Sequence, residues 1–371
     1  MLIVLCLAWA GCRHGLKYPA GYHEFGYVTN GKSDSVSVID LTTFQNIKNI
    51  AVGKSPTGAA VNPLKNEVYV VNTESNNVSF IDVEKNEVVA TLGVHRAPYY
   101  ISVSDDGKRG YVANSGSANV SILDLENRKV ITTIGVGASP GLARVSPDGK
   151  TVVVSNRGGD SVSIIDADKM AVRSTVQVCQ HPEDLVILPD SSKAFVSCTG
   201  SNQVAAVDIK NDRLLTLLSV GQTPIHMALK PDGGEIFVCN YDSSSISVVE
   251  TAANEVGQTF LIGSNPVQAV VSNDNTFLYV SDLSSNTVSI YQIDIGRVIG
   301  TLPTGARPDA LTLTQNQKFL AVANSGSGDV TILRVQRLPS TSSKSKDREI
   351  VTMVRAGESP NAIVVKAFNS K

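Results

Sequence analysis

The sequence predicts an all-β protein, an eight-bladed β-propeller built from four-stranded antiparallel blades. The first observation behind this prediction is a repeated segment: GYVTNGKSDSVSVID at Gly26–Asp40 returns as VYVVNTESNNVSFID at Val68–Asp82 and as GYVANSGSANVSILD at Gly110–Asp124. The second is its strict period of 42 residues, which places one signature position at Asn30, Asn72, Asn114, Asn156, Cys198, Asn240, Asp282 and Asn324. A gapless period of this length is typical of propellers and other repeat folds.

Each copy contains four expected strands in a fixed order. A proline opens an apolar run, an SPDGK-like turn follows with proline and glycine at favoured turn positions, and the next two runs are β-branched or alternate between apolar and polar residues. In the copy that follows Pro140, the expected strands are Gly141–Val145, Thr151–Ser155, Ser161–Asp166 and Ala171–Val178. No helical periodicity competes with this pattern, so each copy is interpreted as one antiparallel blade.

The number of blades follows from the prolines that open the copies. They recur every 42 residues at Pro56, Pro98, Pro140, Pro182, Pro224, Pro266 and Pro308, and Pro360 follows after a longer interval. Seven complete copies therefore run from Pro56 to Gly357. Three expected strands precede them and one follows them: 27–30, 35–41, 47–52 and 361–366. We expect 361–366 to pair with 27–30 and close an eighth blade from both termini, which removes an open strand edge; a seven-bladed ring is the alternative.

The chain is expected to hold one folded domain, the propeller at residues 26–367. Residues 13–25 are expected to be a linker and residues 368–371 a tail. The longer interval before Pro360 is due to an insertion at Leu338–Asp347, between the third and fourth strands of the last complete copy. A tolerated surface loop is the expected form of this insertion, and a functional lid is the alternative.

The repeated residues carry a resemblance to a known family. YVTN at Tyr27–Asn30 with its echoes YVVN and YVAN, the SVSVID strand, and the VG-x-x-P turns at Val52–Pro56, Val136–Pro140 and Val220–Pro224 resemble the YVTN-repeat β-propeller family of surface-layer-like proteins. The resemblance covers nearly the whole chain after residue 25. It implies an exported propeller, and it implies no shared reaction.

The N-terminal segment predicts export. Leu2–Gly11 is apolar but too short to span a bilayer, which is typical of a secretory signal. Ala8-Trp9-Ala10 fits a small-x-small cleavage site, whereas Ala10-Gly11-Cys12 resembles the end of a bacterial lipoprotein box. The favoured interpretation is a signal at residues 1–12 with Cys12 lipidated and an outer-membrane lipoprotein of the cell envelope. A periplasmic or secreted protein is the alternative, and a disordered apolar N-terminus of a cytoplasmic protein is the weakest one.

The composition limits the kinds of binding partner to be expected. The chain has 32 Lys and Arg against 34 Asp and Glu, so its net charge gives no reason to expect a nucleic-acid partner. A monomer is expected, in contact with a membrane only through the lipid anchor. Cys179, Cys198 and Cys239 are odd in number and occupy non-equivalent positions, which predicts buried free thiols instead of a disulfide framework.

Two repeated residues have an expected structural role. The signature Asn is expected to fix the following turn through an Asx-type hydrogen bond. The glycine three residues before each proline is expected to need a positive φ or a close backbone approach. It recurs as Gly53, Gly137, Gly221, Gly263, Gly305 and Gly357, and two copies carry His95 or Cys179 instead.

The best candidate site lies where the copies differ, just after the prolines. Asp184, His226 and Gln268 occupy one equivalent position in three successive blades and are expected to meet at the central channel, with Glu183 and His181 beside them and Arg307 and Asp309 farther round. Arg144, at a position that is small or apolar in other copies, is expected to reach the channel or to pair with an acid. The alternative is a channel lined by groups that bond to water, in which case alanine replacements would leave stability nearly unchanged.

Two chemical alternatives are weaker. Asp184 and His226 are too few to hold a metal, and no sequence spacing adds ligands, so neither a metal nor a cofactor is expected. The Asp-Gly pairs at 106–107, 148–149 and 232–233 lie in hairpin turns and lack calcium-loop spacing. Cys179 served by His181 as a nucleophile is weaker still.

Two classes of function therefore remain. The first is an exported, non-catalytic propeller that binds a protein, a glycan or a small ligand at the loop-convergent face of the channel. The second is a propeller enzyme of the lactone-hydrolase or cofactor-dependent oxidoreductase type. A cluster of at least four charged groups at the channel mouth would discriminate between them, and only Arg144, Glu183, Asp184, His226 and Asp309 could supply it.

Overall fold

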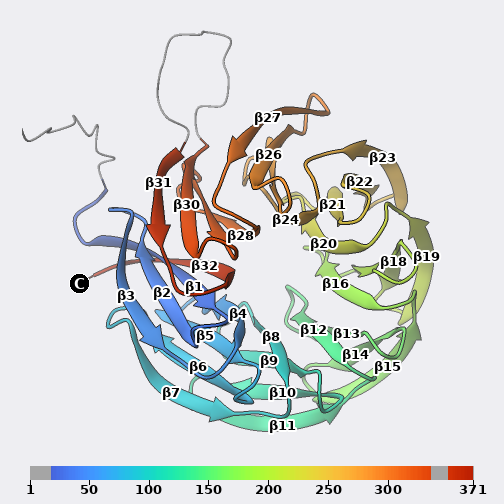
Figure 1. The fold of residues 1–371 in the computed structure, drawn as a ribbon. Coiled ribbons are helices and arrows are strands. Elements are labelled where there is room, and N and C mark those ends of the chain that lie inside the picture. The colour runs from blue at the N-terminus through green and yellow to red at the C-terminus, as the bar shows by residue number, and fades with distance from the viewer. Residues whose placement is uncertain (1–17, 336–349, 371) are drawn as a thin grey trace, which may run out of the picture.

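The computed structural model describes residues 18–335 and 350–370, which form 32 strands in eight four-stranded antiparallel sheets. The sheets are arranged as blades around a central channel (Figure 1). This confirms the prediction of an all-β, eight-bladed propeller and excludes the seven-bladed alternative. The described residues contain no helix that is long and apolar enough to cross a membrane.

Every blade has the same strand order from the channel to the rim. The innermost strands are β32 (Pro360–Asn369), β4 (Pro56–Val61), β8 (Pro98–Val103), β12 (Pro140–Val145), β16 (Pro182–Ile187), β20 (Pro224–Leu229), β24 (Pro266–Val271) and β28 (Pro308–Leu313). The second strands are β1 (Tyr22–Asn30), β5 (Glu67–Asn72), β9 (Arg109–Asn114), β13 (Thr151–Asn156), β17 (Lys193–Cys198), β21 (Glu235–Asn240), β25 (Phe277–Asp282) and β29 (Phe319–Asn324).

The third and outer strands complete each blade. The third strands are β2 (Ser35–Asp40), β6 (Asn77–Asp82), β10 (Asn119–Asp124), β14 (Ser161–Asp166), β18 (Gln203–Asp208), β22 (Ser245–Glu250), β26 (Thr287–Gln292) and β30 (Asp329–Arg334). The outer strands are β3 (Gln45–Ala51), β7 (Glu87–Gly93), β11 (Lys129–Gly135), β15 (Ala171–Gln177), β19 (Arg213–Ser219), β23 (Glu255–Leu261), β27 (Arg297–Pro303) and β31 (Ile350–Arg355).

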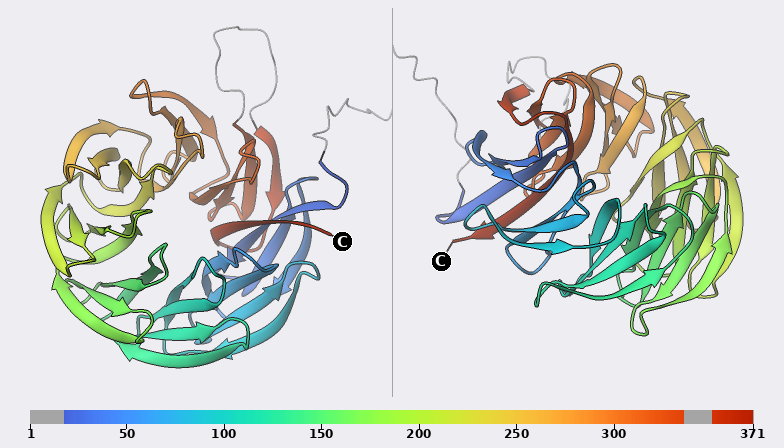
Figure 2. Two further views of the ribbon diagram at one scale, coloured as in Figure 1. Left: turned by 180° about the vertical axis from the view of Figure 1, so that it is seen from behind. Right: turned by 60° about the horizontal axis from the view of Figure 1, so that its bottom comes forward.

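The ring is closed by strands from the two ends of the described chain, as predicted. β32 pairs antiparallel with β1 from Tyr22 opposite Asn369 to Asn30 opposite Pro360, and Figure 2 shows the two strands side by side. The paired region is longer than the sequence indicated, because β1 starts within the expected linker and β32 continues into the expected tail. The strand edge that would remain exposed in a three-stranded blade is thereby covered.

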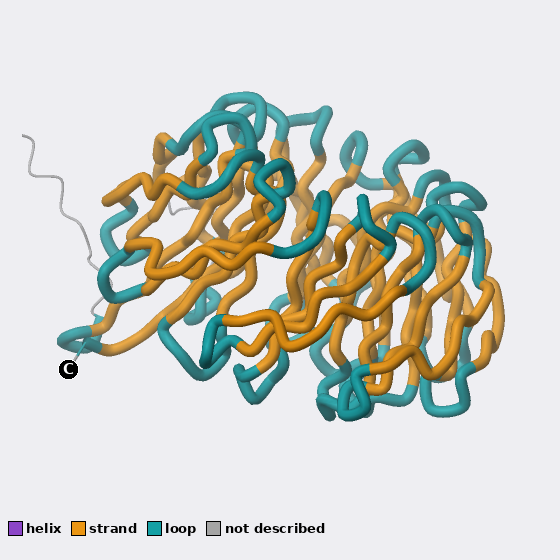
Figure 3. The backbone as a smooth tube through the Cα atoms, turned by 90° about the horizontal axis from the view of Figure 1, so that it is seen from below, coloured by secondary structure: helices purple, strands orange, loops and turns teal. Residues whose placement is uncertain are grey.

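The apolar core lies between the blades. The second and third strands of each blade are buried along nearly their whole length, and each hydrophobic cluster combines side chains from two neighbouring blades. One such cluster joins Val153 and Val162 of one blade to Val196 and Ala205 of the next. Figure 3 shows the ring from the side, with the strands forming the body and the connecting loops gathered on its two faces. Each blade is therefore stabilised mainly by its neighbours.

The signature Asn acts differently from the predicted Asx turn. In six blades its Nδ2 donates to side chains five and seven residues later; Asn156, for example, donates to the hydroxyls of Ser161 and Ser163 at 3.1 and 3.0 Å. These bonds link the second strand of the blade to the third. The Asx turns belong instead to the Asp that ends the third strand in five blades, such as Asp82, whose Oδ1 accepts from the amides of Glu84 and Lys85.

The loop glycine is required for a close approach and not for a positive φ. A Cβ built on Gly53 would lie 2.7 Å from the Cβ of the signature residue Asn72, and the same contact recurs at the other loop glycines. The positive φ values, between 48° and 55°, fall on the residue before each proline, at Ser55, Ala97, Ser139, His181, Thr223, Asn265, Arg307 and Ser359. The backbone there is held from both sides: Ser55 N donates to Asp34, and Ser55 O accepts from Thr73 N.

Some predictions fall outside the described residues. These are the signal at residues 1–12, lipidation at Cys12, and the insertion at Leu338–Asp347, which belongs to the segment that joins β30 to β31. Their interpretation remains a prediction from sequence.

The one described signature position that carries a carboxylate makes stability depend on pH. Asp282 is fully buried, and burial raises its pKa to about 6, although hydroxyls of Ser289 and Thr287 donate to it. A pKa raised by folding stabilises the fold below about pH 4, and this contribution is lost as pH rises through 6. Asp282→Asn restores the repeat residue and should therefore raise the free energy of unfolding at pH 7.5 by about 1–3 kcal/mol.

Urea denaturation of both proteins at pH 4.5 and 7.5 measures this effect, and the difference between them should shrink at the lower pH. Asn240→Asp is the matched control, because it places a carboxylate at the equivalent position of the preceding blade and should introduce the same pH dependence. Equal stability of Asp282→Asn and the parent protein at pH 7.5 would contradict the assignment.

Candidate functional site

A pocket of about 310 Å³ occupies the mouth of the central channel. It is lined mainly by the first two residues after the proline of each innermost strand. We call the first positions the mouth ring and the second positions the inner ring. The mouth ring is Thr57, Tyr99, Gly141, Glu183, Ile225, Val267, Asp309 and Asn361, and all but Gly141 line the pocket. The inner ring, Gly58, Tyr100, Leu142, Asp184, His226, Gln268, Ala310 and Ala362, lines it completely.

A β-bulge explains why two consecutive residues reach the same channel. In a regular strand they would point to opposite faces. The pairing of each innermost strand with the second strand shifts register just after the proline; in β20, for instance, Pro224 pairs with Asn240 and His226 with Cys239, which leaves Ile225 unpaired. A bulge of this kind redirects side chains locally, so every blade can contribute two positions to the pocket.

The structure brings most of the predicted site residues together. Arg144, Glu183, Asp184, His226, Gln268 and Asp309 all line the pocket. His181 and Arg307 do not line it, because they occupy the positive-φ turn before the proline. Both are exposed at the rim, where their charges lower the pKa of Glu183 and Asp309 slightly against the larger, opposite effect of burial.

Asp184, His226 and Gln268, which occupy one equivalent position in three successive blades, accept hydrogen bonds from backbone amides. Asp184 Oδ2 accepts from the amide of Met227 at 2.8 Å, His226 Nδ1 from that of Ala269 at 3.4 Å, and Gln268 Oε1 from that of Leu311 at 2.8 Å. Each acceptor therefore satisfies an amide of the next blade. These bonds argue against the expectation that their loss leaves stability unchanged, because alanine would leave an amide between blades without its acceptor.

The same bonds define the chemistry of His226. Burial lowers its pKa, so the imidazole is neutral at pH 7, and Nδ1 is the acceptor for Ala269 N. The proton of the neutral ring therefore lies on Nε2, which can donate to a ligand. A nitrogen that already carries the proton cannot serve as a general base.

Two arginines form ion pairs on one side of the pocket. Arg144 lies 3.3 Å from Asp184 and stacks over the ring of Tyr100 at 5.4 Å. Arg157 pairs with Glu183 and stacks over the ring of Tyr99 at 4.1 Å. This confirms that Arg144 pairs with a neighbouring acid and reaches the channel. Each guanidinium is fixed between a carboxylate and an aromatic face, which holds both side chains in place.

Arg157 was not predicted, and its position depends on Gly141. A Cβ built on Gly141 would lie 2.6 Å from Arg157 Nε. The side chain of Arg157, from the residue after the signature Asn, thus fills the place that the mouth-ring side chain of that blade would take. The sequence could have indicated this position of Arg157, because Gly141 is the one mouth-ring residue without a side chain.

Asp309 lies alone across the channel from these pairs. Its strand, β28, is four blades away from β12, which carries Arg144, and so on the opposite side of the ring (Figure 1). Burial raises the pKa of Asp309, and no hydrogen bond or ion pair to its carboxylate is found among the described residues. It is a half-buried carboxylate that faces the pocket without a partner.

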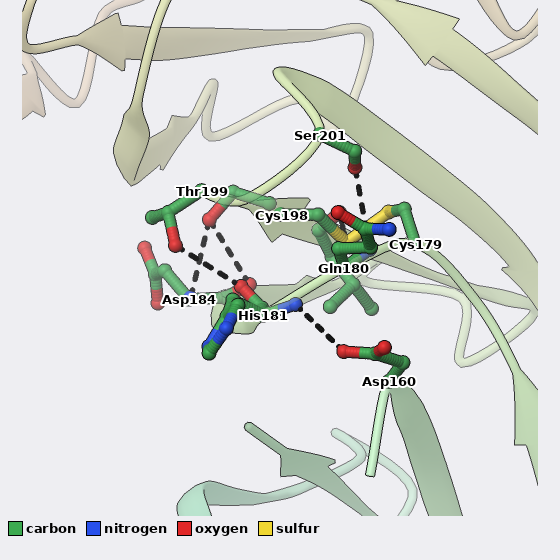
Figure 4. The surroundings of a disulfide bond; sticks show 10 residues. Asp160, Cys179, Gln180, His181, Asp184, Cys198, Thr199 and Ser201 are labelled. Carbon is green, nitrogen blue, oxygen red and sulfur yellow. Dashed lines mark hydrogen bonds between the residues drawn. A yellow bond between two sulfur atoms is a disulfide. The ribbon is translucent and has the colours of Figure 1, made fainter. Parts of the chain in front are cut away.

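The prediction of free thiols at Cys179 and Cys198 is wrong. The two residues form a disulfide, with Cα atoms 5.7 Å apart and a sequence separation of 19. Figure 4 shows the bond beside the turn of Gln180 and His181. Cys239 is buried and free, as predicted. A disulfide-bonded Cys179 is not available as a thiol nucleophile, so the weak proposal of a Cys179–His181 pair is also excluded.

The repeat register could have revealed this disulfide. Cys179 replaces the loop glycine and Cys198 replaces the signature Asn of the same blade. These are the two positions that touch in the other blades, such as Gly137 and Asn156. Counting cysteines missed the bond, because the informative fact is that both members of one contact pair changed together.

Within residues 18–335 and 350–370, no group of three or more His, Cys, Asp or Glu side chains is arranged to hold a metal ion. Asp184 and His226 are both engaged with backbone amides. The pocket is therefore a polar and aromatic site that offers ion pairs, one free carboxylate and hydrogen-bond donors.

The structure is an eight-bladed β-propeller with a polar and aromatic pocket at the mouth of its channel. The chain belongs to the YNCE-like beta-propeller family, which it matches over residues 20–109, 63–145 and 109–343. No curated protein matches it in sequence.

Solved structures share the fold at low sequence identity. Hydrazine synthase of Kuenenia stuttgartiensis is 22% identical, covers 76% of this chain and 96% of its own, and has a TM-score of 0.62. A functionally unknown protein from Desulfotomaculum acetoxidans DSM 771 is 17% identical over 81% of this chain and 99% of its own, with a TM-score of 0.64. The dihydro-heme d1 dehydrogenase NirN, solved in complex with DHE, is 14% identical over 93% of this chain and 75% of its own, with a TM-score of 0.76.

The disulfide should stabilise its blade. The glycine and asparagine found at these two positions in other blades should restore part of that stability. A bond that closes a loop of this length contributes about 3 kcal/mol. Reduction should lower the free energy of unfolding by about 2–4 kcal/mol, whereas Cys179→Gly with Cys198→Asn should regain part of the loss, because the pair recreates the contact of the other blades.

Urea denaturation with and without reductant measures these differences. Each single variant should be less stable than the double variant, and reductant should no longer affect the double variant. Cys239→Ser is the control, because it should leave the response to reductant intact. A double variant no more stable than either single one would contradict the equivalence of the two contacts.

Proposed function

We propose that this protein is an exported, non-catalytic β-propeller that binds a small ligand in the channel-mouth pocket. The observation that carries the proposal is the convergence of charged and aromatic side chains from successive blades on one pocket of about 310 Å³. This volume lies within the range of small-molecule sites, and its walls are the starts of rigid strands. A protein or glycan partner would have to contact the same face from outside.

An enzyme remains the second candidate, since the charged cluster that would favour it is present. Arg144, Glu183, Asp184, His226 and Asp309 line the same pocket, together with Arg157. The arrangement of these groups favours binding, because four of them are already committed to ion pairs and His226 has no free basic nitrogen. Fixed pairs of this kind orient a ligand, and Asp309 is the one carboxylate of the pocket outside these pairs that keeps lone pairs available to act as a base.

Export is supported by two observations. The Cys179–Cys198 disulfide is the kind of bond that persists in oxidising compartments and is rare where thiols are kept reduced. The resemblance of the signature segments to surface-layer-like YVTN-repeat proteins favours the same location. Lipid attachment at Cys12 would then hold the propeller at the envelope, with the outer membrane expected because Arg13 does not resemble an inner-membrane retention signal.

The pocket can be tested by blocking it. Val267→Trp places a large side chain at a half-buried mouth-ring position that lines the pocket. Equilibrium dialysis of the purified protein against a small-metabolite extract, read by mass spectrometry, should show retained compounds that the variant loses. Val298→Trp, on the outer strand β27 and 38% exposed, is the matched control and should retain them.

Retention of the same compounds by Val267→Trp would place the binding surface elsewhere. Recovery of the retained compound in unchanged form supports binding alone. A time-dependent conversion that Val267→Trp abolishes would favour the enzyme instead.

The lipid anchor has its own test. In a bacterial host with an outer membrane, Cys12→Ser should move the protein from the membrane fraction to the soluble periplasm or medium, since acyl chains would be its attachment. Cys239→Ser is the control and should leave the fractionation unchanged. A mature N-terminus at Gly11, found by mass spectrometry, would rule out lipidation at Cys12.

A further inference from the structure

The charges of the channel-mouth pocket point to the chemical class of its ligand. Five side chains in it carry formal charge: Arg144, Arg157, Glu183, Asp184 and Asp309. The two arginines are paired with Asp184 and Glu183, so these four groups neutralise one another. His226 is neutral. One negative charge is left over, and it belongs to Asp309.

The surroundings of Asp309 leave that charge without a partner from the described protein. No described side chain or amide bonds to its carboxylate. Arg307, the nearest cation in sequence, lies outside the pocket at the rim, and its charge lowers the pKa of Asp309 by less than burial raises it. Arg144 and Arg157 belong to the blade formed by β12–β15, which lies across the ring from β28 (Figure 1). A half-buried carboxylate pays a desolvation cost that a cation can offset.

The side chains beside Asp309 are apolar at the mouth ring and polar at the inner ring. The mouth-ring residues of the two preceding blades are Ile225 and Val267, both half-buried, and they form the apolar sector of the ring. Beneath them lie His226, with its Nε2 proton, and Gln268, whose Oε1 is bound to Leu311 N while its Nε2 has no partner within the described protein. A ligand that pairs with Asp309 can therefore also make apolar contacts with Ile225 and Val267.

From this arrangement, and building on the binding function proposed above, we propose that the pocket takes a small organic amine. The protonated amine pairs with the Asp309 carboxylate, and the apolar body of the ligand lies against Ile225 and Val267. The Arg144–Asp184 and Arg157–Glu183 pairs form the opposite wall. Because those arginines are already neutralised, an anionic ligand would have to displace a carboxylate and would meet the repulsion of Asp309.

The test uses two sets of compounds that share a carbon skeleton and differ in the terminal group, and so in charge. One set is tyramine, tyrosol and 4-hydroxyphenylacetate, and the other is isoamylamine, isoamyl alcohol and isovalerate. Titration calorimetry with the full chain should show that the amine binds most tightly in each set. Asp309→Asn keeps the shape of the side chain and should weaken amine binding about 10- to 100-fold, the range of a hydrogen bond to a charged group, with little change for the alcohol.

Asp105→Asn is the control for Asp309→Asn, because Asp105 is an exposed carboxylate in the turn between β8 and β9, on the face opposite the pocket. It should leave every affinity unchanged. If an alcohol or acid binds as tightly as its amine, or if Asp309→Asn leaves amine binding intact, the ligand class is wrong. Loss of that binding in Val267→Trp would then show that the pocket itself still binds.

Absence of binding by all six compounds also overturns the ligand class. The proposed function is then decided separately by the metabolite dialysis described above, since retention of any compound that Val267→Trp loses supports a binding pocket. Failure of both experiments would overturn the function as well.

Discussion

In six of the eight blades a loop glycine packs against the signature residue of the blade it enters, and this contact accompanies the backbone path that leads into the channel. Because Gly53 has no side chain, the loop after β3 can lie directly against Asn72. That path leads the backbone through the positive φ at Ser55 and into Pro56. The bulge that follows then turns two residues toward the channel. The pocket thus depends on a packing contact at a distance from it, repeated round the ring.

The fold could be predicted from sequence almost completely, because its cause is a period that can be counted. The register of the prolines gave eight blades and the pairing of the two terminal strands. The physical reason is that a propeller blade buries its core against the next blade, so the same positions must stay apolar in every copy. The ends of β1 and β32 were less visible, because Tyr22–Phe25 lies before the first copy of the repeat.

The site could be predicted in part, and the misses have a common cause. Asp184, His226 and Asp309 were found because they depart from the repeat at positions that already face the channel. Arg157 and the Cys179–Cys198 bond were missed, since each depends on two positions at once: a guanidinium that uses the space above Gly141, and a disulfide that replaces a glycine–asparagine contact. Comparing the copies one position at a time shows which residue changed. The reason why the change is tolerated appears only when the residue that it contacts is considered as well.

The antiparallel pairing of β1 with β32 also determines on which side of the propeller the two ends of the ring lie. β32 starts at Pro360 beside the pocket and ends at Asn369, and β1 runs back from Tyr22 to Asn30. Tyr22 and Asn369 therefore lie at the end of the blade remote from the channel mouth, and Figure 2 shows the C-terminal end of β32 beside the start of β1. A support or fused domain joined directly to Tyr22 or Asn369 would attach to the side of the ring away from the pocket. The channel mouth would then face away from the attachment, and ligands could arrive and leave while the protein remains attached.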